Sequence, residues 1–292
     1  MTDQGFDPLN PDLPVGDWVN SVVEWFTDTF DPLLDFLDST LGGAYGTLNA
    51  ALQAPPFIAL IVALTAIAWA VRSWKFAVFT LAAFYLVAAM GAWSAAMETL
   101  SLILLAAAVA AALAIPIGIL AAKSQVVSQV VRPILDFMQT MPALVYLLPT
   151  LFAFGIGVVP GMISTIVFAM PPGVRLTELA IRQVDHEVVE AGQAFGSPPM
   201  RILRQIQLPL ALPTIMAGIN QVIMLSLSMV VLAAFVGAAG LGLDVMRGLS
   251  TLNIPIGVEA GLAVVVLAIY LDRVVAALAD RAPVVRASRV RD

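Results

Sequence analysis

Seven apolar segments, each near the length that a membrane helix requires, constrain the fold of this chain more than any other feature. A bilayer core is crossed by about 20 apolar residues in a helix. The segments lie at 56–71, 76–93, 100–122, 134–154, 158–176, 210–236 and 254–278. Only 12% of the residues are charged, against about 25% in a soluble domain. The sequence therefore predicts an all-α integral membrane protein with about seven transmembrane helices.

The basic residues give these segments a direction, because Lys and Arg accumulate in cytoplasmic loops. Residues 1–56 hold nine acidic residues and no Lys or Arg. The polar stretches that follow alternate in charge, and thirteen of the fourteen basic residues fall on one side, with Arg247 as the exception. We therefore expect an extracytoplasmic N-terminus and a cytoplasmic C-terminus.

The acidic N-terminal region also has helical periodicity. Acidic residues fill one face, and apolar residues fill the other. The apolar residues are Trp18, Val22, Trp25, Phe26, Leu33, Leu34 and Leu37. Such a pattern is typical of helices that lie on a membrane surface or that pack on the protein's own outer edge. Because acidic residues are unfavourable on an anionic surface, the pattern favours packing on the protein.

Composition excludes several kinds of chemistry. The chain has no Cys and a single His, His186, which excludes disulfides and thiolate sites, and no metal site is expected. Asp185, His186 and Glu187 are consecutive, and consecutive helical residues do not face one another, so we interpret them as a solvated face. Asp136 lies four residues after Arg132, which predicts an ion pair along one helix. The N-terminus has no basic or apolar run, so no cleavable signal peptide is expected.

A polar segment at 177–209 separates the fifth and sixth apolar segments and cannot cross lipid with its charges. Its pattern predicts a helix over 177–195, ended by Gly196 in the left-handed conformation. Ser197 as N-cap and Pro198 as first residue would begin a second, short helix that closes at Leu208-Pro209. The resulting corner would either fit a groove in another protein or be a solvated cytoplasmic loop.

The spacing within this segment resembles the EAA loop of ABC-importer permeases. The loop reads Glu-Ala-Ala, three residues, Gly, nine residues and Ile-x-Leu-Pro, and every spacing matches, with a glycine in place of the third small residue. In that family the loop is the coupling helix that sits in a groove of the ATPase subunit. The resemblance implies that the ATPase-coupling residues are Glu190, Ala191, Gly192, Gly196, Met200, Leu203, Ile206, Leu208 and Pro209.

Four further motifs narrow the resemblance. "RPILDFMQTMPALVYLLP", "FAMPPGVRLTELAI", "QLPLALPTIMAGINQ" and "LSLSMVVLAAFVGAAGLG" are similar to the glycine betaine/proline osmoprotectant (ProU-type) permeases, over about residues 85–285. The resemblance implies a type I ABC-importer permease core in a bacterial plasma (inner) membrane. It also implies a homodimer, formed with a second permease copy, that works with two cytoplasmic ABC ATPase subunits and an extracytoplasmic solute-binding protein. Membrane lipid is an expected partner and nucleic acid is not.

The sequence also indicates which chain binds ATP. The chain has no phosphate-cradling "GxxxxGK[ST]" run, so ATP and Mg are expected on the partner ATPase and no cofactor is expected here. The expected cargo is glycine betaine, proline or a related compatible solute. Alternatives are another small solute such as methionine, an ATP-independent channel, or a membrane enzyme. No nucleophile–base or metal cluster in the spans supports an enzyme, and a channel gives no reason for the EAA spacing.

Polar residues within the spans could line a translocation path. They share one face of the fourth span and one of the sixth: Gln139, Tyr146 and Thr150, then Asn220, Met224 and Ser228. The alternative is that they hydrogen-bond to neighbouring helices. A quaternary ammonium could sit against aromatic faces, or these rings could simply pack. The candidates are Tyr146, Phe154, Phe168 and Phe235.

The predicted organisation has four parts. An extracytoplasmic amphipathic tail (1–55) is followed by accessory transmembrane helices (56–93). The permease core (94–280) contains the cytoplasmic coupling loop (177–209). A cytoplasmic basic tail (281–292) ends the chain.

Overall fold

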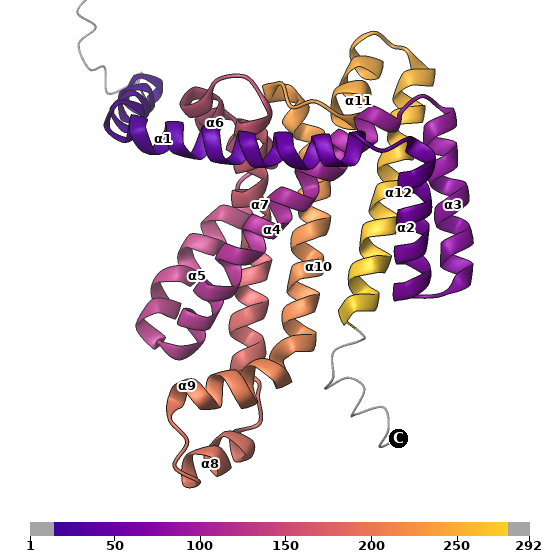
Figure 1. Cartoon of the computed structure of the whole chain (residues 1–292). Helices are drawn as coiled ribbons and strands as arrows, with labels where there is room; N and C mark the ends of the chain where they lie inside the picture. Colours follow the sequence, from indigo (N-terminus) through magenta and orange to yellow (C-terminus); the bar gives the residue numbers. More distant parts are fainter. Residues whose placement is uncertain (1–14, 280–292) are drawn as a thin grey trace, which may run out of the picture.

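The computed structural model describes residues 15–279, and all regular secondary structure in that range is helical. Four long helices run along one another through the molecule (Figure 1). They are α4 (Trp93–Lys123), α7 (Val158–Arg182), α10 (Leu208–Ala233) and α12 (Ile254–Ala279). Two shorter helices, α2 (Phe57–Val71) and α3 (Trp74–Ala89), pair with each other and lie against α12.

Small residues allow the three central helices α4, α7 and α10 to pack closely. A Cβ added at Gly118 of α4 would lie 2.6 Å from Cβ of Thr177 on α7. A Cβ at Gly173 of α7 would lie 2.9 Å from Cβ of Ala114, and one at Gly218 of α10 would come within 3.0 Å of α7. In lipid, where apolar burial does not drive helices together, such close backbone contact is a main source of association.

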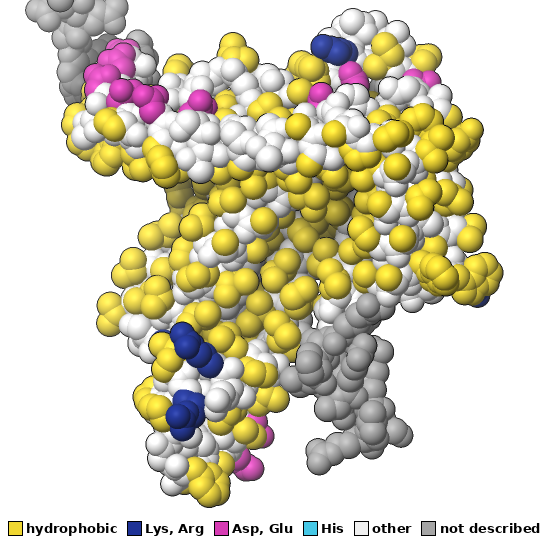
Figure 2. Space-filling view, in the orientation of Figure 1, with side chains coloured by type: hydrophobic (Ala, Val, Ile, Leu, Met, Phe, Trp, Pro, Cys, Tyr) yellow, Lys and Arg dark blue, Asp and Glu magenta, His cyan; other side chains and the backbone are white. Residues whose placement is uncertain are grey.

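The remaining elements lie at the two ends of this bundle. At one end α8 (His186–Ala194) and α9 (Pro199–Ile202) project beyond the long helices (Figure 1). At the other end lie α1 (Val15–Gln53), α6 (Leu147–Phe154) and α11 (Leu241–Ser250). Figure 2 shows a broad hydrophobic band between the two ends, with most of the visible charged side chains at the ends themselves. This distribution is that of a protein whose middle lies in lipid.

By length and composition, four helical segments could cross a membrane. They are α4, α7, α12 and a continuous segment over Pro199–Val236 that contains α9, α10 and the turns beside them. The helices α2 and α3 have only 15 and 16 residues. Two consecutive pairs are bent, α1 with α2 by 99°, and α5 (Gln125–Thr140) with the segment at 143–154 by 111°. The number of seven spans therefore stays a prediction.

The span predicted over 134–154 is sharply bent in the structure. The helix α5 ends at Thr140, Met141 is extended with ψ 133°, and a 3-10 turn (Ala143–Tyr146) begins after Pro142 and leads into α6. A proline disfavours helical backbone at the residue before it, so the sharp bend follows from Pro142.

The second half of α1 packs on the end of the bundle. Leu34 and Tyr45 are buried, and Leu41 and Leu52 pack against the main hydrophobic core. No described side chain between residues 16 and 33 is buried. The predicted division into tail, accessory helices and core is not tested by the fold, and the basic tail at 281–292 lies outside the described residues.

Candidate functional site

The loop between α7 and α10 begins with a break that the sequence pattern did not predict. The helix expected over 177–195 is two helices, because α7 ends at Arg182 and α8 starts after Asp185. The Asp185 carboxylate accepts a hydrogen bond from the amide of Glu187 at 2.9 Å. It is therefore the N-cap of α8, where such a side chain satisfies an otherwise free amide. The acid-histidine-acid run is a helix start, and its side chains are exposed.

The predicted corner at Gly196 is confirmed. Its φ is +74°, in the left-handed region that glycine adopts without strain. The amide of Ser197 donates to the carbonyl of Gly192 at 3.1 Å, and that of Gly196 donates to the carbonyl of Gln193 at 2.8 Å. Such bonds satisfy the last carbonyls of a helix. The predicted N-cap at Ser197 is wrong, because the second helix begins one residue later, with Pro198 as the flanking residue and no side-chain cap.

Two apolar residues of the short second helix and its continuation point inward. Ile202 and Leu203 are buried, with Leu203 in a cluster with Ile181 and Val184. The interpretation that they form the surface for an ATPase groove is therefore wrong. Met200 is exposed, so its contact with an ATPase stays a prediction. Leu203, in the π-helical stretch (Leu203–Gln207) that follows α9, packs on the end of α7, and Ile202 lies against Gly192 of α8.

Gly192, the departure from the family pattern, has a packing role. A Cβ at this position would lie 2.9 Å from Cδ1 of Ile206 and 3.5 Å from Cγ1 of Ile202. The glycine allows α8 to lie close against the start of the α10 segment. The sequence pattern gave no reason for it, because the contact joins residues on opposite sides of the turn.

Phe195 is the most prominent apolar side chain of the loop, and the sequence analysis missed it. It is 90% exposed and precedes the Gly196 corner directly. Together with Met200, at 57% exposed, it forms what we call the loop tip. The sequence feature that could have indicated this exposed residue is a large aromatic side chain next to a helix-ending glycine in a polar loop.

The second half of the loop is continuous with α10. The sequence predicted that Leu208-Pro209 closes the short helix, and this is wrong. The chain passes from α9 through one π-helical stretch (Leu203–Gln207) straight into α10. A proline has no amide hydrogen and crowds the preceding turn. The wide turn directly before Pro209 accommodates it without ending the helix.

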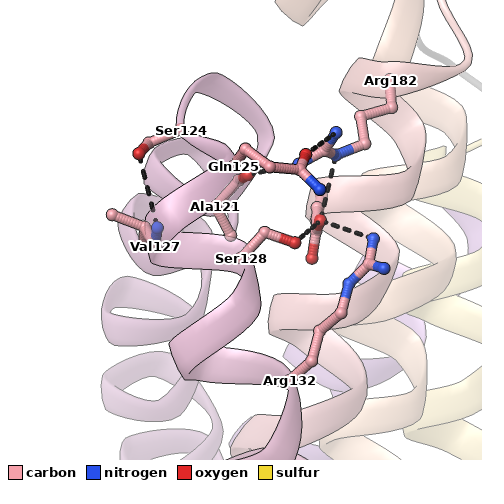
Figure 3. Close-up of polar contacts among 8 residues, drawn as sticks. Ala121, Ser124, Gln125, Val127, Ser128, Arg132 and Arg182 are labelled. Carbon is pink, nitrogen blue, oxygen red and sulfur yellow. Dashed lines mark hydrogen bonds and ion pairs between the residues drawn. The ribbon is translucent and has the colours of Figure 1, made fainter.

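A buried carboxylate joins the ends of three helices next to the loop. Oε1 of Glu178 on α7 accepts hydrogen bonds from Oγ of Ser128 at 2.8 Å and from Nη2 of Arg132 at 2.8 Å, both on α5. It also pairs with Nε of Arg182 at 3.0 Å. Arg182 in turn donates to the carbonyl of Ala121 on α4 at 2.8 Å. Figure 3 shows Ser128, Arg132 and Arg182 directed at this one carboxylate.

This cluster, which we call the Glu178 cluster, fixes α5 and α7 to each other at the start of the loop. The Glu178 side chain is only 4% exposed, and a buried charge is tolerated only when it is paired and hydrogen-bonded. The predicted ion pair between Arg132 and Asp136 is wrong, since Arg132 pairs with Glu178 and Asp136 pairs with Arg175 of α7. Both arginine pairs therefore join α5 and α7 rather than stabilise a single helix.

Comparison with known proteins decides the family. Residues 114–282, which include the loop, α7, α10 and the last part of α4, match the family model described as "Binding-protein-dependent transport system inner membrane component". The chain belongs to this family. The resemblance seen in the sequence motifs is thereby confirmed, as is the all-α permease fold.

Three matches illustrate the relationship. The chain is 45% identical over 264 residues to the glycine betaine transport system permease protein OpuAB of Bacillus subtilis (strain 168), covering 90% of this chain and 94% of that one. It is 41% identical over 273 residues to the glycine betaine/proline betaine transport system permease protein ProW of Escherichia coli (strain K12), covering 93% and 77%. A chain of the MetNI methionine ABC transporter, solved in inward facing conformations, matches with a TM-score of 0.56 at 23% identity, covering 65% and 92%.

Membership implies the general partners of this permease. A component of a binding-protein-dependent ABC importer works with an ATPase and a solute-binding protein, and its own role is transport rather than catalysis. No group of three or more His, Cys, Asp or Glu residues that could hold a metal ion occurs within residues 15–279.

The proposed path residues do not converge in this permease. Tyr146 is buried and donates to the carbonyl of Met138, and Oγ1 of Thr150 lies 2.6 Å from Oγ of Ser164 on α7. Nδ2 of Asn220 on α10 donates to Asp272 of α12 at 3.2 Å. These three side chains thus make the bonds within the bundle that the alternative interpretation expects.

The other three path residues lie on the outside of the single chain. Gln139, Met224 and Ser228 are exposed, the last two on one side of α10. Of the aromatic candidates, Tyr146 and Phe168 make a T-shaped contact with 5.7 Å between ring centroids. A path through the six residues stays a prediction.

Proposed function

We propose that this permease imports glycine betaine, proline or a related compatible solute. The support is that three relatives at 40–45% identity, each matched over 90% or more of this chain, are named as permeases for glycine betaine, alone or with proline betaine or carnitine. These compounds share a small size and a fixed or balanced charge. Methionine is less well supported as cargo, because the likeness to the methionine transporter is in fold alone.

We propose that the loop tip seats in a groove of the ATPase subunit and that α9 transmits ATPase motion to α10. The observation that carries this proposal is the continuity of the helix from Pro199 to Val236. A displacement of the loop tip reaches the membrane core without an intervening flexible joint. Glu190 is exposed on α8, where a basic residue of the ATPase could pair with it.

The other motif residues have an internal role in this proposal. Gly196 sets the corner, and Gly192 and Ile206 hold α8 against the segment that leads into α10. Leu203 anchors the second helix to the end of α7. Leu208 and Pro209 continue the helix into the membrane. The motif thus combines a contact surface with the packing that makes this surface rigid.

The proposed assembly is a homodimer of this permease with two cytoplasmic ATPase subunits and an extracytoplasmic binding protein. ATP and Mg would bind the ATPase chains, so that their motion drives alternating access in the permease pair. The loop end of the bundle would face the cytoplasm, because Lys123, Arg132, Arg182, Arg201 and Arg204 lie toward that end. The end with α1 would face outward.

Uptake by the reconstituted complex tests the cargo. Liposomes that contain the permease, the ATPase and the binding protein should accumulate labelled glycine betaine when ATP is enclosed in the lumen, on the ATPase side. Unlabelled proline betaine should compete for this uptake. Methionine uptake without betaine uptake would contradict the cargo. Flux without ATP would instead indicate a channel. A control complex with an ATPase that cannot hydrolyse ATP separates transport from leakage.

A further inference from the structure

The first half of α1 extends away from the bundle with its apolar side chains uncovered. The bend of 99° between α1 and α2 lays α1 across the end of the long helices (Figure 1). Its second half is held there by Leu34 and Tyr45. From residue 16 to residue 33 no described side chain is buried. Even the two tryptophans are largely exposed, Trp18 at 57% and Trp25 at 62%.

This half of α1 has two sharply separated faces. With 3.6 residues per turn, one arc of about 120° holds exposed apolar side chains, namely Trp18, Val19, Val22, Trp25, Phe26, Leu33 and Phe36. The opposite arc of about 80° holds six acids and Asn20 and is equally exposed. The acids are Asp17, Glu24, Asp28, Asp31, Asp35 and Asp38. A helix with such faces requires an apolar environment on one side and water on the other.

The orientation of these faces matches the rest of the molecule. At this end of Figure 2 acidic side chains gather on the side away from the bundle, and hydrophobic side chains lie on the side toward the hydrophobic band. The apolar face of α1 is thus at the level where the long helices leave the lipid. Tryptophan and phenylalanine are typical of that level, where an apolar ring meets the lipid headgroups.

We propose that residues 16–36 of α1 form an interfacial helix whose apolar face inserts into the lipid surface at the end opposite the coupling loop. Within Val15–Gln53 there is no Lys or Arg, so attraction to anionic headgroups cannot hold the helix there. Burial of its aromatic and aliphatic side chains is the driving force. The sequence pattern favoured packing on the protein, and this holds only for the second half of α1.

The proposal rests on the membrane-spanning bundle and is independent of cargo and ATPase coupling. A second copy of the chain is the competing occupant of the apolar face. If the α1 helices of two copies packed against each other, their two rows of acids would lie at the same end of the complex and repel each other. The acidic face and its position at the edge of the hydrophobic band favour lipid instead.

Single cysteines test the proposal directly, because the chain has no native cysteine. Val22→Cys places an environment-sensitive fluorophore on the apolar face, and Glu24→Cys places the same probe on the acidic face as a matched control. The full-length protein is reconstituted in vesicles of phosphatidylcholine, a zwitterionic lipid. Quenching is measured with iodide in water and with a lipid that carries a nitroxide near its headgroup.

At position 22 we expect quenching by the nitroxide lipid and loss of quenching by iodide, with the reverse at position 24. Added phosphatidylglycerol should not strengthen the insertion, because the helix carries acids and no Lys or Arg. Iodide quenching at both positions would overturn the proposal, because the helix would then be solvated. Shielding of position 22 from both quenchers, with cysteine cross-linking between copies, would overturn it in favour of a dimer contact. A need for anionic lipid would also contradict it.

Discussion

Replacing Phe195 by alanine should weaken attachment of the ATPase while leaving the permease itself intact. The ring is 90% exposed in the single chain, so its removal takes little from the fold. If the ATPase groove covers it, full burial of a phenylalanine contributes about 1.5–3 kcal/mol. Since about 1.4 kcal/mol corresponds to a tenfold change in affinity, the dissociation constant for the ATPase should rise roughly 10-fold to 100-fold.

The assay is a titration of purified ATPase onto the permease in nanodiscs, with thermal unfolding of the permease measured alongside. Leu203→Ala is the contrasting variant, because Leu203 is buried inside the loop. A buried leucine truncated to alanine costs about 2–5 kcal/mol of stability, so its main effect should be a lower unfolding temperature. A double replacement of Met200 and Leu203 would mix the two effects and is less informative.

Two results would refute this reasoning. Wild-type ATPase affinity in Phe195→Ala would show that the loop tip is not covered by the partner. A fall in permease stability as large as that of Leu203→Ala would show that the ring is packed in the membrane-embedded protein. In either case the exposed tip would not be the contact surface.

Three further changes test the loop and its support. Gly196→Val should destabilise the loop by about 1–2 kcal/mol, because φ is +74°, and should therefore weaken ATPase coupling, whereas Gly196→Asn should be tolerated. Hydrolysis-coupled uptake is measured for both variants. Equal uptake would contradict the need for this conformation. Glu178→Gln should destabilise the protein by about 1–3 kcal/mol, measured by thermal unfolding, and Arg132→Gln should cost less because Ser128 and Arg182 still bond to the carboxylate; an equal loss would show that the carboxylate does not organise the cluster. Gly118→Ala should cost about 1–3 kcal/mol, since its Cβ would meet α7 at 2.6 Å, while Gly261→Ala, with nothing within 4 Å, should not lower the unfolding temperature.

Local signals in the sequence predicted much of the fold. The helices and the left-handed corner at Gly196 depend on hydropathy and on neighbouring residues, so a single sequence is enough to predict them. The bend after Thr140 also has a local cause, Pro142, which indicates a kink in the span, but the apolar run on both sides does not show that the bend reaches 111°. The start of α8 at Asp185 was hidden in the same way by a continuous helical pattern.

The site was harder to predict because its contacts join distant residues. Glu178 bonds to Ser128, which lies 50 residues earlier. Arg132 also pairs with Glu178, but the sequence pattern favoured Asp136, only four residues away from Arg132. Leu203 faces inward only because the loop folds back on α7. Phe195 is informative only once Ile202 and Leu203 are known to be buried. Which apolar side chains remain exposed is a property of the folded chain.

The continuous helix from Pro199 to Val236 has a mechanical consequence. Its 38 residues make a beam about 57 Å long at 1.5 Å per residue. It is supported by α7 in its middle and near its far end, because a Cβ at Gly218 would come within 3.0 Å of Leu176 and a Cβ at Gly161 of α7 within 2.8 Å of Ala233. At the loop end, Leu203 packs with Ile181 of α7. Because α7 contacts the beam along its length, the two helices should move as one unit, and a push on the loop end would displace both of them together.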